Sequence, residues 1–339
     1  MTIPTPILVT GGAGFIGSHT VVELLGAGHA VVVLDNFANA KPSVLDRMRT
    51  VAGCDFTFIE GDVRDADCLA ALFHDHSIQA VIHFAGLKAV GESTKAPLAY
   101  YQNNLAGTLN LLEAMRGAGC RDLVFSSSAT VYGDPAQVPI REDFPLSATN
   151  PYGRSKLMIE DICRDLASSE PGWRIALLRY FNPVGAHPSG LLGEDPTGFP
   201  NNLMPFLLKV ASGQRPCLQV FGQDYPTLDG TGVRDYLHVV DLAQGHLAAL
   251  EALPRLEGAV PINLGTGRGY SVLEMVQAME KAVGHPIPWR FAPRRPGDIA
   301  RCYADATLAE DLLGWKATRD LETMCRDGWA WASSGAGAS

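Results

Sequence analysis

Three glycines spaced three residues apart strongly limit how the start of this chain can fold. Gly11, Gly14 and Gly17 lie between an apolar run, Ile7 to Thr10, and a helical pattern, Phe15 to Leu25. In a strand–turn–helix unit, the first glycine permits the tight turn, the second lets the backbone approach a pyrophosphate, and the third allows close packing of the helix. The free N–H groups of the helix would then face the anion. A flexible surface loop is the alternative, but the flanking strand and helix favour a dinucleotide site.

The next predicted strand, Ala30 to Asp35, ends in a carboxylate. An acidic side chain at this position can accept hydrogen bonds from both ribose hydroxyls, and it repels the additional phosphate of NADP. Asp35 therefore predicts NAD, rather than NADP, as the cofactor.

The ends of two further predicted strands extend this site. Asp62 follows the run Phe56 to Glu60, and its carboxylate could accept from an adenine amino group. Capping of the following helix by Asp62 is an equally good interpretation. Phe84-Ala85-Gly86 ends the fourth strand, where small residues would let the second half of the cofactor cross the sheet edge.

The alternation of short apolar runs with helical patterns predicts the fold class. The runs are apolar throughout, as expected for strands that are covered on both faces. Strand–helix alternation implies parallel pairing, so we expect an α/β fold with a doubly wound parallel sheet of Rossmann type. Besides the strands already named, the pattern recurs at Ala80 to Phe84, Leu123 to Ser127 and Ile175 to Arg179.

A change in composition after Asn182 predicts the domain organisation. Prolines and glycines interrupt the chain from Pro183 to Pro200, which indicates mostly loop. We expect an NAD-binding domain over 1–181, a smaller α/β substrate domain over 182–332 and a flexible tail over 333–339. Within the second part, a segment of about 235–265 could return to the first domain, because Val260 to Leu264 resembles a strand.

Charge and cysteine content exclude several classes of partner. The net charge of −9 argues against general binding to nucleic acid or to an anionic membrane. No apolar run approaches the ~20 residues of a membrane helix, and the start has no positively charged region typical of a signal peptide. The seven cysteines are scattered without zinc spacing, so we expect no metal, free thiols and a cytoplasmic location.

A tyrosine and a lysine four residues apart are the candidate catalytic pair. Asn150 and Pro151 predict the start of a helix that places Tyr152 and Lys156 on one face. A lysine ammonium near the phenol would lower the pKa of Tyr152 from ~10 and make it a general base. Ser128, the outermost of three serines at a predicted strand end, is the candidate hydrogen-bond partner of the substrate oxygen. A surface tyrosine, a solvated lysine and a turn-capping serine are the alternatives.

These motifs together resemble the extended short-chain dehydrogenase/reductases, and longer blocks resemble the UDP-glucose 4-epimerase (UDP-galactose 4-epimerase) family. The resemblance covers Ile7 to Trp331. The blocks that carry it are Thr10-Gly-Gly-Ala-Gly-Phe-Ile-Gly-Ser-His19, His83-Phe-Ala-Gly-Leu-Lys-Ala-Val-Gly-Glu-Ser93, Arg179-Tyr-Phe-Asn-Pro-Val-Gly-Ala-His-Pro188, Asn201-Asn-Leu-Met-Pro205 and Gly230-Thr-Gly-Val-Arg-Asp-Tyr236.

The resemblance implies an isomerase that interconverts UDP-galactose and UDP-glucose. In such an enzyme NAD stays bound, and Tyr152 takes the proton of the sugar 4-hydroxyl while hydride leaves the same carbon. The 4-keto sugar then rotates, and hydride and proton return to the opposite face. Lys156 would also hold the nicotinamide ribose, and a firm grip on the diphosphate would leave the sugar free to turn.

The resemblance also implies the binding residues. The cofactor set comprises Gly11, Gly14, Phe15, Ile16, Gly17, Asp35, Asn36, Asn39, Asp62, Val63, Phe84, Ala85, Gly86, Lys88, Asn103, Tyr152, Lys156 and Phe181. The substrate set comprises Lys88, Ser128, Tyr152, Asn182, Asn202, Leu203, Gln219, Val220, Phe221, Arg234, Tyr236, Arg295, Asp298 and Cys302. Capping of a helix by Asn202 and surface pairing of Arg234 are the structural alternatives at those positions.

Cys302 bears on the choice of sugar. In the family, the aligned position holds a bulky tyrosine in some members and a small residue in others. A small residue leaves room beside the second carbon of the sugar, so we expect UDP-N-acetylglucosamine and its galacto epimer to be accepted as well. The alternative is a buried thiol whose surroundings are filled by Leu203 or Tyr303.

Other functions use similar motifs. A nucleotide-sugar dehydratase would carry Asp-Glu where this chain has Ala129-Thr130. A decarboxylase, a simple dehydrogenase or a non-catalytic NAD-sensing regulator would keep the same fold. The family usually forms homodimers through helices of the NAD domain, and the candidates here are Pro97 to Arg116 and Tyr152 to Ala167.

Overall fold

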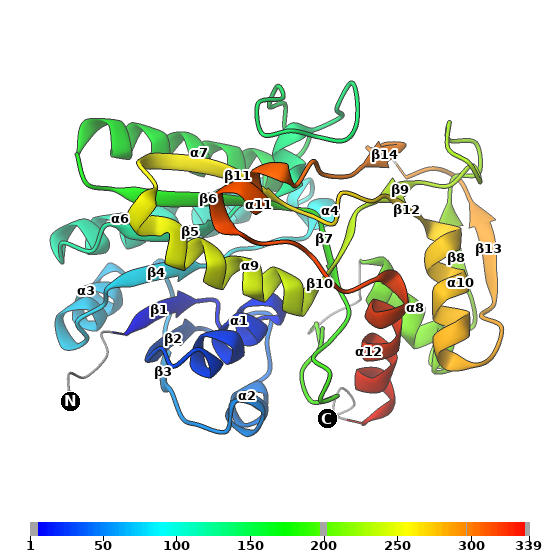
Figure 1. Ribbon diagram of the computed structural model, residues 1–339, viewed down its shortest axis with the longest axis horizontal. Helices are drawn as coiled ribbons and strands as arrows, with labels where there is room; N and C mark the ends of the chain where they lie inside the picture. Colours follow the sequence, from blue (N-terminus) through cyan, green and yellow to red (C-terminus); the bar gives the residue numbers. More distant parts are fainter. Residues whose placement is uncertain (1–5, 197–201, 296, 336–339) are drawn as a thin grey trace.

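The computed structural model describes residues 6–196, 202–295 and 297–335, and its centre is a single parallel sheet (Figure 1). The seven strands follow the order β11-β6-β5-β4-β1-β2-β3, and every neighbouring pair is parallel. Six of these strands have the order typical of dinucleotide-binding sheets, with the reversal between β1 and β4. The strands are β1 (Ile7–Thr10), β2 (Val31–Asp35), β3 (Thr57–Glu60), β4 (Ala80–His83), β5 (Asp122–Ser126), β6 (Arg174–Tyr180) and β11 (Gly258–Leu264).

Helices cover both faces of this sheet, which confirms the predicted fold class. One face packs against α1 (Phe15–Gly26), α2 (Val44–Ala52), α9 (Val239–Ala252) and α11 (Thr307–Leu313). The other face packs against α3 (Ala66–Asp75), α6 (Gly107–Gly117) and α7 (Pro151–Ser169). Within β1, Ile7 and Val9 enter the first core while Leu8 enters the second, because successive strand side chains point to opposite faces.

The predicted strands are confirmed to within about a residue, with one difference in burial. β3 is an edge strand, and its side chains are exposed or half-buried rather than covered on both faces. The run Val260 to Leu264 does belong to the main sheet, where β11 pairs with β6. The helix expected over Pro97 to Arg116 is formed by α5 (Pro97–Tyr100), a π-helical turn at Tyr101–Ala106 and α6.

A smaller second layer lies at one end of the sheet, on the right of Figure 1. Its core is formed by α8 (Leu203–Ala211), α10 (Val272–Val283) and α12 (Leu321–Ser333). Beside them run three small sheets made of β7 (Asn182–Val184) with β10 (Tyr236–His238), β8 (Leu218–Phe221) with β13 (Trp289–Ala292), and β9 (Val233–Arg234) with β12 (Tyr270–Ser271) and β14 (Arg301–Cys302).

The predicted domain boundaries do not coincide with the observed cores and helix ends. The first core takes α9, β11 and α11 from the second part of the chain. α12 runs one residue into the predicted tail, and Ser334 donates a hydrogen bond to the carbonyl of Gly190 at 2.9 Å. Residues 336–339 lie outside the described residues, as do residues 197–201, including Pro200 and Asn201 of the sequence blocks. No helix among the described residues is long and apolar enough to cross a membrane.

Candidate active site

The glycine loop joins β1 to α1 at the point where the strand order reverses. Gly11 has a φ of +69°, and a Cβ there would lie 2.7 Å from the amide nitrogen of Ala85. A Cβ on Gly17 would lie only 2.3 Å from the carbonyl oxygen of Gly11, so this glycine lets the helix pack on the loop itself. Gly12, which the sequence analysis passed over, is also tightly packed, because a Cβ there would lie 2.8 Å from a methyl carbon of Val33.

The N-terminus of α1 is open to an anion. Its N-cap is Gly14, which has no side chain to cap the helix, and its first turn has no acidic residue. The first N–H groups of a helix have no partner within the helix, and the helix dipole makes this end positive. The uncapped N–H groups and the close-packed glycine turn before them fit a bound dinucleotide pyrophosphate.

Asp35 holds the loop from the end of β2. Its carboxylate accepts from the backbone N–H of Ala13 and of Phe37, both at 2.9 Å. Burial raises the pKa of Asp35, and the backbone donors oppose that rise. The predicted ribose acceptor thus also fixes the turn that forms the phosphate cradle.

Asp62 does not cap the helix that follows it, so that interpretation is wrong. The N-cap of α3 is Asp65, while Asp62 accepts from Arg64 at 2.7 Å and from Asn36 at 2.9 Å. The guanidinium of Arg64 lowers the pKa of Asp62 to about 2, so its carboxylate is ionised and can accept further hydrogen bonds. The role of Asp62 toward an adenine remains a prediction.

The segment that follows β4 is linked to the candidate catalytic helix by hydrogen bonds of one asparagine. Asn104, whose importance the sequence did not reveal, accepts from the N–H of Leu87 at 2.8 Å and donates to Ser155 at 3.0 Å. A Cβ on Gly86 would lie 3.3 Å from Asn104 Oδ1 and 3.8 Å from the ammonium nitrogen of Lys156. The predicted Asn103 side chain donates to Asn104 at 3.1 Å.

The candidate catalytic side chains meet at the carboxyl end of β5. Asn150 caps α7 by accepting from the N–H of Gly153 at 2.9 Å. Tyr152 and Lys156 are both buried on that helix. Ser128 hydrogen-bonds the phenol of Tyr152, and the Lys156 ammonium donates to the carbonyl of Ser126 at 2.6 Å. A surface location for this pair is therefore wrong.

The electrostatics of the pair differ from the sequence-based expectation. Burial raises the pKa of Tyr152, and only the hydrogen bond from Ser128 acts to lower it. Lys156 is not among the groups that shift the pKa of Tyr152, and burial lowers the pKa of the Lys156 ammonium itself to about 7. Tyr152 therefore needs additional positive charge beside it before it can act as a base near neutral pH.

Opposite these residues, three charged side chains gather around β9. Asp298 lies 3.9 Å from Arg234 and 3.5 Å from Arg295. The Arg234 guanidinium also donates to the carbonyls of Val233 and Ile299, each at 2.9 Å. Arg295 lies over the ring of Phe221, 4.3 Å from its centre. The structure thus brings together Arg234 and Arg295, the two arginines of the substrate set, which are the candidates to clamp the diphosphate.

Other predicted substrate residues are less accessible. Val220 and Tyr236 are buried in the core of the smaller layer, whereas Gln219 is exposed. Asn182 is exposed in β7, and Phe181 is buried just before it. Cys302 lies in β14 beside Arg234 in β9 and packs against the cluster that contains Val131 and Phe181.

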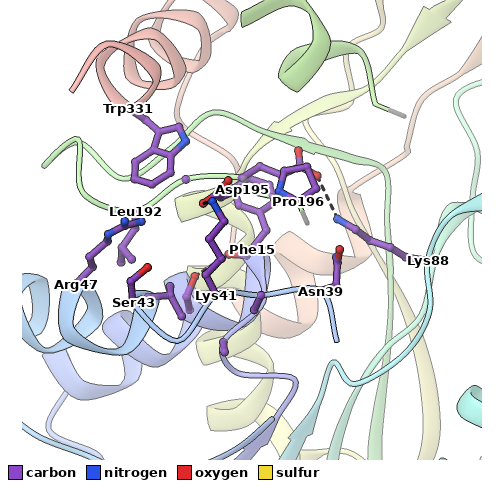
Figure 2. A pocket seen from close by; sticks show the side chains of 16 residues that line it. Phe15, Asn39, Lys41, Ser43, Arg47, Lys88, Leu192, Asp195, Pro196 and Trp331 are labelled. Atoms are coloured by element: carbon purple, nitrogen blue, oxygen red, sulfur yellow. Dashed lines mark hydrogen bonds and ion pairs between the residues drawn. The ribbon is translucent and has the colours of Figure 1, made fainter. Parts of the chain in front are cut away.

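An acidic residue that the sequence analysis missed links two predicted site residues. Glu194 accepts from Lys88 at 3.1 Å and from Asn202 at 3.2 Å. Asn202 occupies the N-cap position of α8 but its side chain does not cap that helix. The neighbouring Asp195 pairs with Lys41 at 3.0 Å. Figure 2 shows this segment facing Lys41, Asn39 and Phe15 across a cavity that Lys88 also lines.

Comparison with known proteins places this arrangement among related enzymes. Residues 7–265 match the model of the NAD dependent epimerase/dehydratase family. The UDP-glucose 4-epimerase of Bacillus subtilis (strain 168) is 61% identical over 328 residues, which cover 97% of each chain. The UDP-glucose 4-epimerase of Mus musculus is 57% identical over 332 residues, covering 96% of each.

Two solved structures have nearly the same fold. The UDP-glucose 4-epimerase of Bifidobacterium longum, in complex with NAD+ and UDP, is 53% identical with a TM-score of 0.95 over 99% of this chain and 100% of that one. The enzyme from Stenotrophomonas maltophila, with bound NAD and formylated UDP-arabinopyranose, is 52% identical with a TM-score of 0.96 over the same shares.

Proposed function

Because the chain belongs to the NAD dependent epimerase/dehydratase family, with UDP-glucose 4-epimerases as its relatives, we propose that it interconverts UDP-galactose and UDP-glucose. The observation that carries this proposal is the buried set of Ser128, Tyr152 and Lys156 beside the glycine cradle of β1 and α1. These side chains can hold and move a proton at one sugar hydroxyl, next to a site for a dinucleotide.

The residues present fit NAD, which supplies the hydride acceptor and donor when it is bound. The glycine loop and the open N-terminus of α1 would hold the pyrophosphate. Asp35 would accept from the adenosine ribose. The remaining proposed contacts are Phe15, Ile16, Asn36, Asn39, Asp62, Val63, Phe84, Ala85, Gly86, Lys88, Asn103, Lys156 and Phe181.

Tyr152 is the proposed acid and base for the 4-hydroxyl of the sugar. Ser128 holds the Tyr152 phenol by a hydrogen bond, and the same hydroxyl can share the reacting oxygen. Lys156 is buried and fixed to the Ser126 carbonyl, so its ammonium keeps one position during the reaction. After the 4-keto sugar has turned, Tyr152 returns the proton from the phenol to the same oxygen.

The uridine diphosphate is proposed to bind between β9 and the segment after β13. Arg234 and Arg295 offer guanidinium groups that match phosphate oxygens. Asp298 lies 3.9 Å from Arg234 and 3.5 Å from Arg295, and Lys88 and Asn202 both bond Glu194. Asn182, Leu203, the Gln219–Phe221 strand and Tyr236 complete the proposed substrate set. Fixing the diphosphate leaves the sugar free to present either face.

Activity on UDP-N-acetylglucosamine and its galacto epimer is also proposed. Cys302 is a small residue that pairs with Arg234 across two strands. It packs against the cluster that contains Val131 and Phe181. The Cys302→Tyr variant should lose turnover of the acetylated sugars and keep turnover of UDP-galactose. Equal rates for wild type and variant on the acetylated sugar would contradict the steric argument.

A homodimer in the cytoplasm is the proposed state of the enzyme. Leu98, Leu109 and Met158 are exposed apolar side chains on α5, α6 and α7, and a second copy would cover them. The seven cysteines are all free thiols, which suits a reducing compartment. Sedimentation velocity should give a dimer for wild type and a monomer for Leu98→Glu, whereas a wild-type monomer would contradict the proposal.

The epimerase proposal is tested with the purified protein alone. NAD should be released from the denatured protein in an amount near one per chain, and UDP-galactose added to the native protein should yield UDP-glucose without added cofactor. Steady formation of NADH in proportion to substrate consumed would instead indicate a dehydrogenase. Absence of both NAD and turnover would indicate a binding protein.

A further inference from the structure

The candidate catalytic helix carries a third buried ionisable residue that the proposed mechanism does not use. Tyr152, Lys156 and Glu160 follow one another at intervals of four residues on α7, so they share one helix face. Glu160 is fully buried, and its carboxylate lies toward the ends of β5 and β6. A buried carboxylate needs donors on both oxygens, so its partners reveal its role.

Each of three consecutive serines forms a hydrogen bond with a different one of these three helix residues. The carbonyl of Ser126 accepts from Lys156 at 2.6 Å, the hydroxyl of Ser127 donates to Glu160 at 2.6 Å, and Ser128 hydrogen-bonds Tyr152. Ser126 is the last residue of β5 and the last that pairs with β6. Ser127 and Ser128 lie beyond that ladder. The Ser128 hydroxyl accepts from Thr130 and caps the following turn, while the hydroxyl of Ser127 bonds α7 through Glu160.

The Glu160 carboxylate is itself held in place by Arg179 of β6. The guanidinium makes two bonds to it, from Nε to Oε1 at 2.9 Å and from Nη2 to Oε2 at 2.6 Å. Its remaining nitrogen donates to Tyr132 and to the carbonyl of Glu142, each at 3.0 Å. Both members of the pair are at most 1% exposed. Such a two-bond pair fixes direction as well as distance.

We propose that Ser127, Glu160 and Arg179 are positioning residues, which set the place of Ser128 against Tyr152. They act through the strand end: Arg179 orients Glu160, Glu160 holds Ser127, and Ser127 fixes the backbone that carries Ser128. None of the three touches the reacting atoms. This inference rests on the proposed function of Tyr152 as the proton-transfer group.

The interaction between Ser128 and Tyr152 predicts the direction in which the pKa of Tyr152 should change. The bond from Ser128 acts to lower the pKa of Tyr152, so loosening Ser128 should raise that pKa. The groups that interact with the Tyr152 phenol from other elements are Tyr100 of α5 and Tyr180 of β6, and Lys156 lies beside it on α7. The Ser127 hydroxyl donates to Glu160 and to none of these groups.

The test variant is Ser127→Ala, which removes one donor from Glu160 but leaves both bonds from Arg179 and the bond from Arg164 of the same helix at 2.6 Å. We expect kcat to fall about tenfold, because a small misplacement of a reacting group is costly. KM for UDP-galactose and the NAD content should stay at wild-type values, and the acidic limb of the kcat profile should move to higher pH. Ser169→Ala, an exposed serine on the same helix, is the control and should match wild type.

A second measurement separates this inference from the proposed function. Titration of the tyrosinate absorbance, with the Tyr152→Phe curve subtracted, follows the Tyr152 phenol without any turnover. Ser127→Ala should raise this pKa, and Glu160→Gln should do the same if it folds. An unchanged phenol pKa and kcat in Ser127→Ala would overturn the positioning inference even if wild type is an active epimerase. A wild type without epimerase activity would overturn the proposed function only.

Discussion

The two sides of the candidate site differ in how their charged groups are paired. On the α7 side, Lys156 and Glu160 are buried and bound to the strand ends by short hydrogen bonds. On the clamp side, Arg234 and Arg295 pair with Asp298, and the side chain of Arg295 is 53% exposed. Lys88, which lines the cavity beside the glycine loop, pairs with Glu194 and is 44% exposed. The hydrogen bonds of the first side are already formed in the free protein, whereas the arginines of the second side must exchange a carboxylate for phosphate oxygens.

This difference agrees with the chemistry that each side has to perform. Proton transfer needs groups that are fixed before the substrate arrives. A diphosphate must enter and leave, and exposed ion pairs worth about 0–1 kcal/mol can be replaced by phosphate oxygens at little cost. The comparison therefore predicts large effects on rate from the α7 side and modest effects on KM from the clamp side.

Removal of the proposed base should have the largest effect. Tyr152→Phe keeps the ring but deletes the hydroxyl, so we expect kcat to fall by about 10²–10⁴-fold with NAD still bound. Initial rates and the NAD content of the purified variant measure both quantities. A variant that keeps more than half of the wild-type rate would show that another group transfers the proton.

Gly17→Ala tests the rigidity of the cofactor cradle. The new Cβ would lie 2.3 Å from the carbonyl of Gly11, and we expect loss of copurified NAD and about 1–3 kcal/mol of stability. Gly26→Ala is the control, since a Cβ at the end of the same helix meets nothing within 4 Å. Equal NAD content in both variants would contradict a tight cradle.

Arg234→Lys tests the clamp. A lysine cannot reproduce the two-pronged guanidinium contact, so we expect KM for UDP-galactose to rise about tenfold with little change in kcat. Arg290→Lys, on an exposed strand of the same domain, should match wild type. A fall in kcat without a rise in KM would mean that Arg234 belongs to the fixed side of the site.

Glu194→Gln should have the smallest effect. Loss of the negative charge releases Lys88 and Asn202 from a partly exposed pairing, so KM for UDP-galactose should fall about two- to threefold. Glu113→Gln, in an exposed pair with Arg116, is the matched control. An increase in KM would show instead that Glu194 helps to organise the bound state.

The sequence predicts best what lies close together along the chain. The glycine loop, Asp35 and the Tyr152–Lys156 pair belong to short motifs whose helix and strand context is visible in the residues. Glu194 could not be predicted, because it meets Lys88 across 106 residues. Nor could Glu160, because it lies on α7 and its partner Arg179 comes from strand β6.

Besides contacts between residues far apart in the chain, the burial of individual side chains could not be predicted from the sequence. The tyrosine and lysine spacing predicts mutual stabilisation of the phenolate, but both groups are buried. Burial shifts the pKa of Lys156 down and that of Tyr152 up. The same limit applies to Val220 and Tyr236, which the resemblance placed at the substrate and the fold places in a core.

The most direct test of the account follows the hydrogen on carbon 4 of the sugar. UDP-galactose carrying deuterium at that carbon is incubated with the purified protein, and the UDP-glucose formed is analysed by mass spectrometry and NMR. The account predicts that deuterium is retained at carbon 4 of the product and that no NADH accumulates. Loss of the label to solvent, or release of labelled NADH with each turnover, would contradict it.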